Sequence, residues 1–144
     1  MIIYSQRDSR WAQLKLGFSQ LTMGRFGCTT CCISMLTTYY HPDETPDKTV
    51  KTIKYTPGGL VIWNSVSYPN FKFTKRYYFR DNKVIEAYIK DPKKAVILEV
   101  QHSHWVVATG KSFFGGYNIA DPWFGDRSTT RRYNDDITGF AIFN

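Results

Sequence analysis

Apolar residues recur with the spacing of an α-helix between Cys28 and Tyr40. The positions that follow this spacing are i, i+3, i+4, i+7, i+8, i+11 and i+12, which are Cys28, Cys31, Cys32, Met35, Leu36, Tyr39 and Tyr40. A stripe of this kind predicts a helix with one apolar face. The helix is expected to end at Tyr40, because a residue that precedes proline, here His41 before Pro42, disfavours the α conformation.

Two further helices are predicted by the residues at their boundaries. Thr45 and Pro46 suit the N-cap and the first position of one helix, which is expected to end near Gly58. Asp81 suits the N-cap of the other, which the proline at position 92 ends. Their apolar residues with helical spacing are Val50, Ile53, Val84, Ile85, Tyr88 and Ile89.

Short apolar runs predict strands, mostly in the second half of the chain. The runs cover residues 71–79, 95–100, 104–108, 117–121 and 140–143. A turn at Gly115–Gly116 is expected to pair the third run with the fourth, and residues 1–27 predict an irregular arm or a short hairpin. Helices first and antiparallel strands later, without a βαβ rhythm, predict an α+β fold in a single domain of residues 1–144.

Composition excludes several classes of protein. Of the 144 residues, 24 are Tyr, Phe or Trp, which predicts a ring-rich core with rings to spare for a binding cleft. No apolar run has the length of a transmembrane helix, and the first residues lack the basic and apolar segments of a secretory signal. We therefore expect a cytoplasmic monomer, or one that reaches the cell wall by another route.

The net charge of +7 favours anionic partners such as nucleic acid, anionic lipid or an anionic cell wall. The positive residues are spread along the chain, and no zinc-finger spacing, RNA-binding signature or helix-turn-helix pattern accompanies them. We expect no nucleic-acid partner. A solvated basic surface without a dedicated partner is the alternative.

Cys28 is the candidate nucleophile. It follows Gly27 and begins the strongest predicted helix, where the helix dipole favours a thiolate and an unpaired backbone N–H is half of an oxyanion hole. Gly27 is expected to let a substrate approach without a side chain in the way. The alternative is that Cys28 is a small buried hydrophobe.

His104 and Asp121 are the candidate partners of this thiol. His104 begins one predicted strand, and histidine serves as both base and acid near neutral pH. His102 lies two residues away and is expected to share its strand face. Asp121 ends the next strand, where it could accept a hydrogen bond from the second ring nitrogen of His104 and orient the ring.

The chain resembles a family of cysteine peptidases. Residues 4–40, with their Gly-Cys helix start, together with "SHWVVATG" and "YNIADPW", are similar to the free-standing C39-like branch of the bacteriocin-leader-processing peptidases. The resemblance covers residues 4–40 and 95–144, and it is looser over residues 41–94. It implies a papain-like fold, in which a catalytic helix packs on an antiparallel sheet, and hydrolysis of peptide bonds without a cofactor.

The resemblance also implies site residues. Cys28 is then the nucleophile, His104 the general base and acid and Asp121 the orienting residue, while a glutamine supplies the second oxyanion donor. Papain-like enzymes usually carry that glutamine about six residues before the cysteine, where this chain has a threonine. Gln6 fits the N-terminal glutamine of the family, and Gln20 is the alternative.

The chain departs from the family after the nucleophile. Relatives often read Gly-Cys-Gly-Pro-Thr-Ser, whereas residues 27–32 read Gly-Cys-Thr-Thr-Cys-Cys. Cys31 and Cys32 are expected to be core thiols, and the alternative is a redox bridge between Cys28 and Cys31 that would silence the nucleophile. Three tryptophans are expected first of all to belong to the core, and the alternative is that they line the cleft or shield the His104–Asp121 pair: Trp11, Trp105 and Trp123.

Other functions fit the same residues. A metal hydrolase would use His102 and His104 as ligands, with Asp121 or Cys28 as a third, but no further metal motif accompanies them. A catalytically silent binding module of the same fold is the second alternative. Within the enzyme class, a general peptidase is the first hypothesis, and a peptidase or amidase that degrades peptidoglycan, from a phage or bacterial lysis system, is the second.

Overall fold

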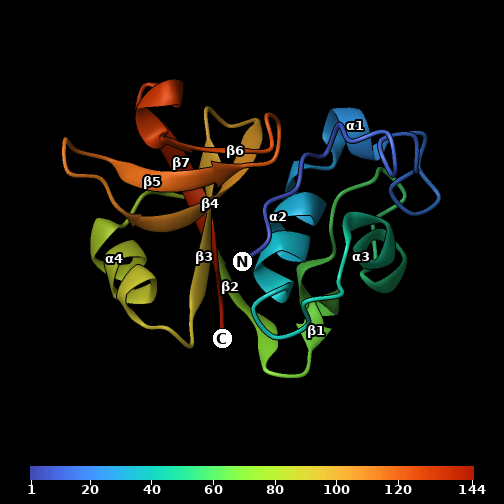
Figure 1. The fold of residues 1–144 in the computed structure, drawn as a ribbon, viewed down its shortest axis with the longest axis horizontal. Coiled ribbons are helices and arrows are strands. Elements are labelled where there is room, and N and C mark those ends of the chain that lie inside the picture. The colour runs from blue at the N-terminus through green and yellow to red at the C-terminus, as the bar shows by residue number, and fades with distance from the viewer.

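The computed structural model describes residues 1–144, and its centre is a seven-stranded antiparallel sheet in the order β1-β2-β7-β3-β4-β5-β6. Four helices complete an α+β fold (Figure 1). The strands are β1 (Ser67–Tyr68), β2 (Phe71–Tyr77), β3 (Ala95–Val100), β4 (His104–Lys111), β5 (Tyr117–Asp121), β6 (Asp126–Thr129) and β7 (Ile137–Phe143). The helices are α1 (Met23–Phe26), α2 (Cys28–Thr37), α3 (Pro46–Thr52) and α4 (Asn82–Lys90).

Helices cover both faces of this sheet. Figure 1 shows α4 on one side of β3 and β4, and α2 on the other with α1 and α3. Successive side chains of a strand point to opposite faces, so Val96 and Leu98 pack with Ile85 of α4 while Ile97 packs on the side of α2. Two covered faces explain why β3 is a continuous apolar run instead of an alternating one.

Helix α2 is more deeply buried than an amphipathic pattern indicates, since every residue except Thr29 is buried. It ends at Thr37, and the predicted end at Tyr40 is wrong. The hydroxyl of Thr37 donates to Ile33 O, and that of Thr38 donates to Met35 O. These bonds, with a tightened last turn, end the helix before the exposed tyrosines.

Helix α3 begins after Thr45 as predicted, but it ends at Thr52 and not near Gly58. The chain then folds back on itself, because the Lys54 N–H donates to Ser65 Oγ and a bridge joins Tyr55 to Val61. Helix α4 begins at Asn82 and ends at Lys90, and the Asp81 carboxylate accepts from the Val84 N–H as its N-cap. Those boundaries are confirmed.

Two predicted strands are confirmed to the residue, β3 and β5, and the turn at Gly115–Gly116 does join β4 to β5. β4 continues past its predicted end to Lys111 through an irregularity after Ala108. β2 ends at Tyr77, before the predicted residue 79, and β7 begins at Ile137, before the predicted residue 140. The sequence pattern does not predict three short elements, each of four residues or fewer: α1, β1 and β6. None of the helices has the length and apolar character needed to cross a bilayer.

Candidate active site

His104 and Asp121 meet at one end of the sheet. His104 is the first residue of β4 and Asp121 is the last residue of β5, and the two strands are antiparallel neighbours, so these positions fall at the same edge. The imidazole Nε2 lies 2.9 Å from Asp121 Oδ1. The structure therefore brings this predicted pair together.

Asp121 is completely buried, and both of its carboxylate oxygens are fully used. Oδ1 accepts from His104 and from the Trp123 N–H at 3.0 Å. Oδ2 accepts from the Arg132 guanidinium at 3.0 Å and from the Tyr133 hydroxyl. Burial of a charge is unfavourable unless it is paired, and here four donors offset that loss.

The same contacts shift two pKa values in opposite directions. Burial opposes the charge on Asp121, but hydrogen bonds from His104, Tyr133 and Arg132 outweigh it and lower the pKa of Asp121 to about 2. Burial also opposes the charge on His104, but its hydrogen bond with Asp121 and its proximity to Cys28 raise the pKa of His104 to about 9. At neutral pH the pair is an imidazolium held by a carboxylate.

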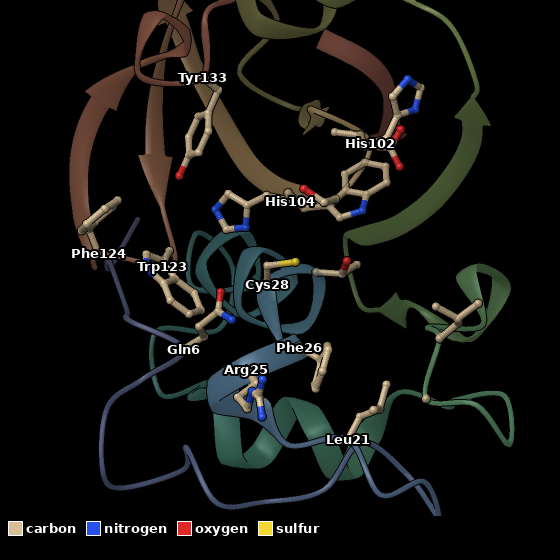
Figure 2. A pocket seen from close by; sticks show the side chains of 16 residues that line it. Gln6, Leu21, Arg25, Phe26, Cys28, His102, His104, Trp123, Phe124 and Tyr133 are labelled. Atoms are coloured by element: carbon tan, nitrogen blue, oxygen red, sulfur yellow. The ribbon is translucent and has the colours of Figure 1, made fainter. Parts of the chain in front are cut away.

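Cys28, at the start of α2, lies in the same cleft as this imidazolium. Because Nε2 is bound to Asp121, the ring nitrogen that remains for the thiol is Nδ1. Figure 2 shows the Cys28 side chain in the same cleft as His104. The Cys28 N–H lies in the first turn of α2, where backbone donors have no acceptor within the helix. A thiol, a backbone donor and an imidazolium thus lie in one cleft.

The expected role of Gly27 is wrong. A Cβ placed on Gly27 would lie 2.5 Å from the Met23 carbonyl oxygen and 2.6 Å from the Met23 Sδ. The space is filled by α1 and not by the cleft. Glycine is required here so that α1 and α2 can follow each other closely, and a substrate gains no access from it.

Gln6 reaches the cleft from the N-terminal segment, and Gln20 does not. Gln6 is 1% exposed, its backbone N–H donates to Pro122 O at 2.8 Å, and its Nε2 donates to Gly24 O at 3.2 Å. The second N–H of this amide is left for another acceptor, and Oε1 has no partner. Gln20 is exposed and accepts from Lys15 instead.

The cleft around these residues has a volume of about 620 Å³ and a mixed lining (Figure 2). Trp105 and Trp123 line it, and Trp105 also belongs to the buried core. Trp11 does not line the cleft, since it is buried in the core, where its Nε1 donates to Ser5 O at 2.8 Å. The full lining is Gln6, Leu21, Arg25, Phe26, Cys28, Thr29, Gly59, Leu60, Glu99, His102, Ser103, His104, Trp105, Trp123, Phe124 and Tyr133.

His102 lines the far part of the cleft but shares no strand face with His104. It lies in the turn between β3 and β4 with φ +55°, so the expectation of a shared face is wrong. No group of three or more His, Cys, Asp or Glu side chains is arranged to hold a metal ion. The donor set that a metal hydrolase would need is therefore not assembled around His104.

Cys31 and Cys32 lie beneath the cleft and are completely buried. Cys31 Sγ donates to Tyr4 O at 3.5 Å, and Cys32 Sγ donates to Trp105 O at 3.4 Å. Burial raises the pKa of both thiols well above the usual value. Their expected place in the core is confirmed, and all three cysteines are free thiols.

Arg132 and Tyr133 belong to the site, although sequence reasoning did not select them. They lie in the 3₁₀-helix η2 (Thr130–Tyr133), which follows β6, and their side chains reach Asp121. Arg132 also binds both oxygens of Asp126, at 2.8 and 2.9 Å. The available signal was a basic and aromatic triplet, Arg131–Tyr133, shortly after a strand that ends in aspartate.

Chemically, the arrangement supplies a nucleophile, a proton donor and acceptor, an orienting carboxylate and two possible oxyanion donors. This is the set that acyl transfer through a covalent intermediate requires. Comparison with known proteins adds no family to this description: no protein-family model matches the chain, and neither a curated protein nor a solved structure does.

Proposed function

We propose that this protein is a cysteine peptidase that hydrolyses peptide bonds through a Cys28–His104–Asp121 triad. One observation carries the proposal: His104, held at 2.9 Å by a completely buried Asp121, lies in one cleft with the helix-start thiol of Cys28. The similarity of the sequence motifs to C39-like peptidases supports it. A papain-like fold is part of the proposal, and the helix α2 packed on an antiparallel sheet is consistent with it.

The reaction begins with attack of the Cys28 thiolate on the carbonyl carbon of the substrate. The oxyanion accepts hydrogen bonds from the Cys28 N–H and the free N–H of Gln6. The His104 imidazolium gives its proton to the leaving amine, and a thioester remains. Neutral His104 then takes a proton from water, which attacks the thioester and releases the acid and Cys28.

Asp121 keeps His104 in the orientation and charge state that both steps need. Its carboxylate bonds the Nε2 proton, so that Nδ1 faces the thiol. Since four donors hold the carboxylate, Asp121 does not have to reorganise when the ring gains or loses its second proton. The residue acts through His104, as a positioning residue.

The test is a comparison of wild type with Cys28→Ala and Cys32→Ala in a broad peptide-library digest. Cys28→Ala is expected to lower kcat/KM by about 10³-fold or more, because the covalent route is lost. Cys32→Ala removes a thiol from the same helix outside the cleft and is expected to keep activity. Equal cleavage by all three proteins would overturn the proposal.

Thiol labelling separates the peptidase from a silent binding module. Iodoacetamide at neutral pH is expected to modify Cys28 faster than a free model thiol, and to spare Cys31 and Cys32 in the folded protein. A Cys28 that reacts no faster than the model thiol would mean that the nucleophile is not activated. The labelled position is read from peptide masses.

The net charge of +7 keeps an anionic cell-wall substrate as the second candidate. Zymography on purified peptidoglycan, run beside the peptide digest, distinguishes the two substrate classes. Clearing of peptidoglycan without peptide cleavage would assign the wall. Cys28→Ala is the control in both assays.

A further inference from the structure

Two thiols of α2 have a spacing that the proposed peptidase chemistry does not use. Cys28 and Cys31 are three residues apart, at the first and fourth positions of the helix. Residues i and i+3 of a helix are neighbours, with Cβ atoms about 5–6 Å apart. A disulfide requires Cβ atoms about 3.5–4.5 Å apart, so the bridge closes only when the first turn of α2 adjusts to bring the two Cβ atoms closer together.

The two thiols differ in access. Cys28 is 8% exposed and lines the cleft, whereas Cys31 is completely buried and is not part of the lining. A small oxidant that enters the cleft meets Cys28 first. Because burial raises the pKa of Cys31, that thiol stays protonated and is itself a poor target for the oxidant.

Cys32 is equally buried, but its surroundings differ. Its Sγ donates to Trp105 O of the sheet, while the Cys31 Sγ donates to Tyr4 O of the N-terminal segment. A bridge from Cys28 to Cys32 would join residues i and i+4 of the helix. The common redox arrangement is instead the C-x-x-C spacing, which Cys28 and Cys31 have. Cys31 is therefore the better partner for Cys28.

We propose that Cys28 and Cys31 form a reversible redox site, in which Cys31 traps the oxidised nucleophile as an intrahelical disulfide. Peroxide is the oxidant: the Cys28 thiolate attacks one peroxide oxygen, the O–O bond breaks, and Cys28 becomes a sulfenic acid while hydroxide leaves. The Cys31 sulfur then attacks the Cys28 sulfur and the S–O bond breaks. The hydroxyl group leaves with the Cys31 proton as water, and a low-molecular-weight thiol can later reduce the bridge.

The consequence for Cys28 is protection. A sulfenic acid without a neighbouring thiol proceeds to sulfinic and sulfonic acids, which simple thiols do not reduce. A bridge to Cys31 stops the oxidation at a stage that a dithiol reverses. While the bridge exists, the proposed nucleophile has no thiolate.

The experiment follows one peptide by mass. No lysine or arginine lies between Arg25 and Lys48, so trypsin releases residues 26–48 with all three cysteines. Wild type treated with graded peroxide, then denatured and alkylated, is expected to yield this peptide lighter by two hydrogens and with one alkylated cysteine instead of three. Dithiothreitol before alkylation is expected to restore three.

Two matched variants assign the partner. Cys31→Ala is expected to form no bridge and to accumulate sulfinic and sulfonic Cys28, which dithiothreitol does not restore. Cys32→Ala is expected to form and lose the bridge like wild type. The inference is overturned if wild type shows no bridged peptide at any peroxide dose, if Cys31→Ala recovers its Cys28 thiol as wild type does, or if only Cys32→Ala abolishes the bridge.

The readout needs no substrate, so it is independent of the peptidase proposal. A bridged peptide in a protein that cleaves nothing would leave the redox site standing and remove the proposed activity. Cleavage without a bridged peptide would do the reverse.

Discussion

The two walls of the cleft differ in how completely their polar groups are paired. On the sheet side, both oxygens of Asp121 have two donors each, and Arg132 is held in turn by Asp126. On the helix side, the Cys28 N–H has no acceptor within α2, and Gln6 keeps one free N–H and an unpartnered Oε1. The sheet wall is complete without a substrate, whereas the helix wall leaves donors for one.

This difference predicts how a substitution on each wall affects the stability and the activity of the protein. A change on the sheet wall breaks bonds that exist in the free protein, so it should lower stability and activity together. A change on the helix wall removes a donor that is idle until substrate binds, so it should lower activity alone.

The largest effect is expected for Asp121→Asn. In the variant, the amide N–H groups would face donors that bind the Asp121 carboxylate in the wild-type protein. His104 would also lose its charged partner. We expect a loss of about 10³–10⁴-fold in kcat and a decrease of about 3 kcal/mol in the free energy of unfolding. Kinetics with urea denaturation measure both.

Asp126→Asn is the matched control for Asp121→Asn. It removes the other carboxylate partner of Arg132, at the exposed rim of the same network. Activity within a few-fold of wild type is expected. If this variant loses as much activity as Asp121→Asn, the buried position of Asp121 has no special role.

A smaller effect is expected for Gln6→Met, which keeps the size of the side chain and removes its donors. We expect kcat to fall by about 10²–10³-fold with little change in KM, as for the loss of one oxyanion donor. The free energy of unfolding should change little, because an unpartnered buried oxygen disappears together with the bond to Gly24. Gln20→Met, on the surface, should behave as wild type, and equal losses in both variants would contradict the assignment.

The pH dependence should report the charge of His104. Because its folded pKa is raised to about 9, its stabilising contribution is full below its ordinary pKa of about 6.5 and is lost as pH rises through about 9. Above pH 9, kcat/KM should fall about tenfold per unit as the imidazolium disappears. Rates and urea unfolding from pH 6 to 10 test this, with His102→Gln expected to leave the profile in place. An alkaline limb near pH 6.5 would show that the pair does not hold the proton.

The smallest effect is expected for Tyr133→Phe. One donor to Asp121 Oδ2 is removed, while Arg132 still binds that oxygen. Activity should fall a few-fold, and the free energy of unfolding should decrease by about 1 kcal/mol. Tyr39→Phe, an exposed tyrosine, is the control; an unchanged Tyr133→Phe protein would mean that the hydroxyl contributes nothing to the sheet wall.

Much of the fold could be read from local pattern, because α4, β3 and β5 have caps or apolar runs that need no distant partner. The residues of the proposed triad could be selected from the sequence for the same reason: Cys28, His104 and Asp121 each lie where a predicted element begins or ends. Two features bring these three residues together: the hairpin turn between β4 and β5, and the packing of α2 on the sheet. Only the turn could be predicted from the sequence, from Gly115–Gly116.

Other features depend on contacts between distant residues, which no local sequence pattern predicts. Tyr133 reaches Asp121 from η2, an element that lies beyond β6 in the sequence. The reason for Gly27 is the approach of Met23 from a four-residue helix. The hydrophobic spacing continues to Tyr40, so it does not indicate where α2 ends. The end depends on the hydroxyls of Thr37 and Thr38, which compete for backbone carbonyl oxygens of the last turn.

The position of β7 in the sheet has a consequence for biosynthesis. This strand is the last of the seven to leave the ribosome, yet it lies between β2 and β3 and pairs with both. A nascent chain without residues 137–143 therefore presents two open strand edges that invite pairing with other chains. The sheet can become continuous only after synthesis has passed Phe143, so β3 to β6, with His104 and Asp121, are synthesised before the strand that joins them to β2.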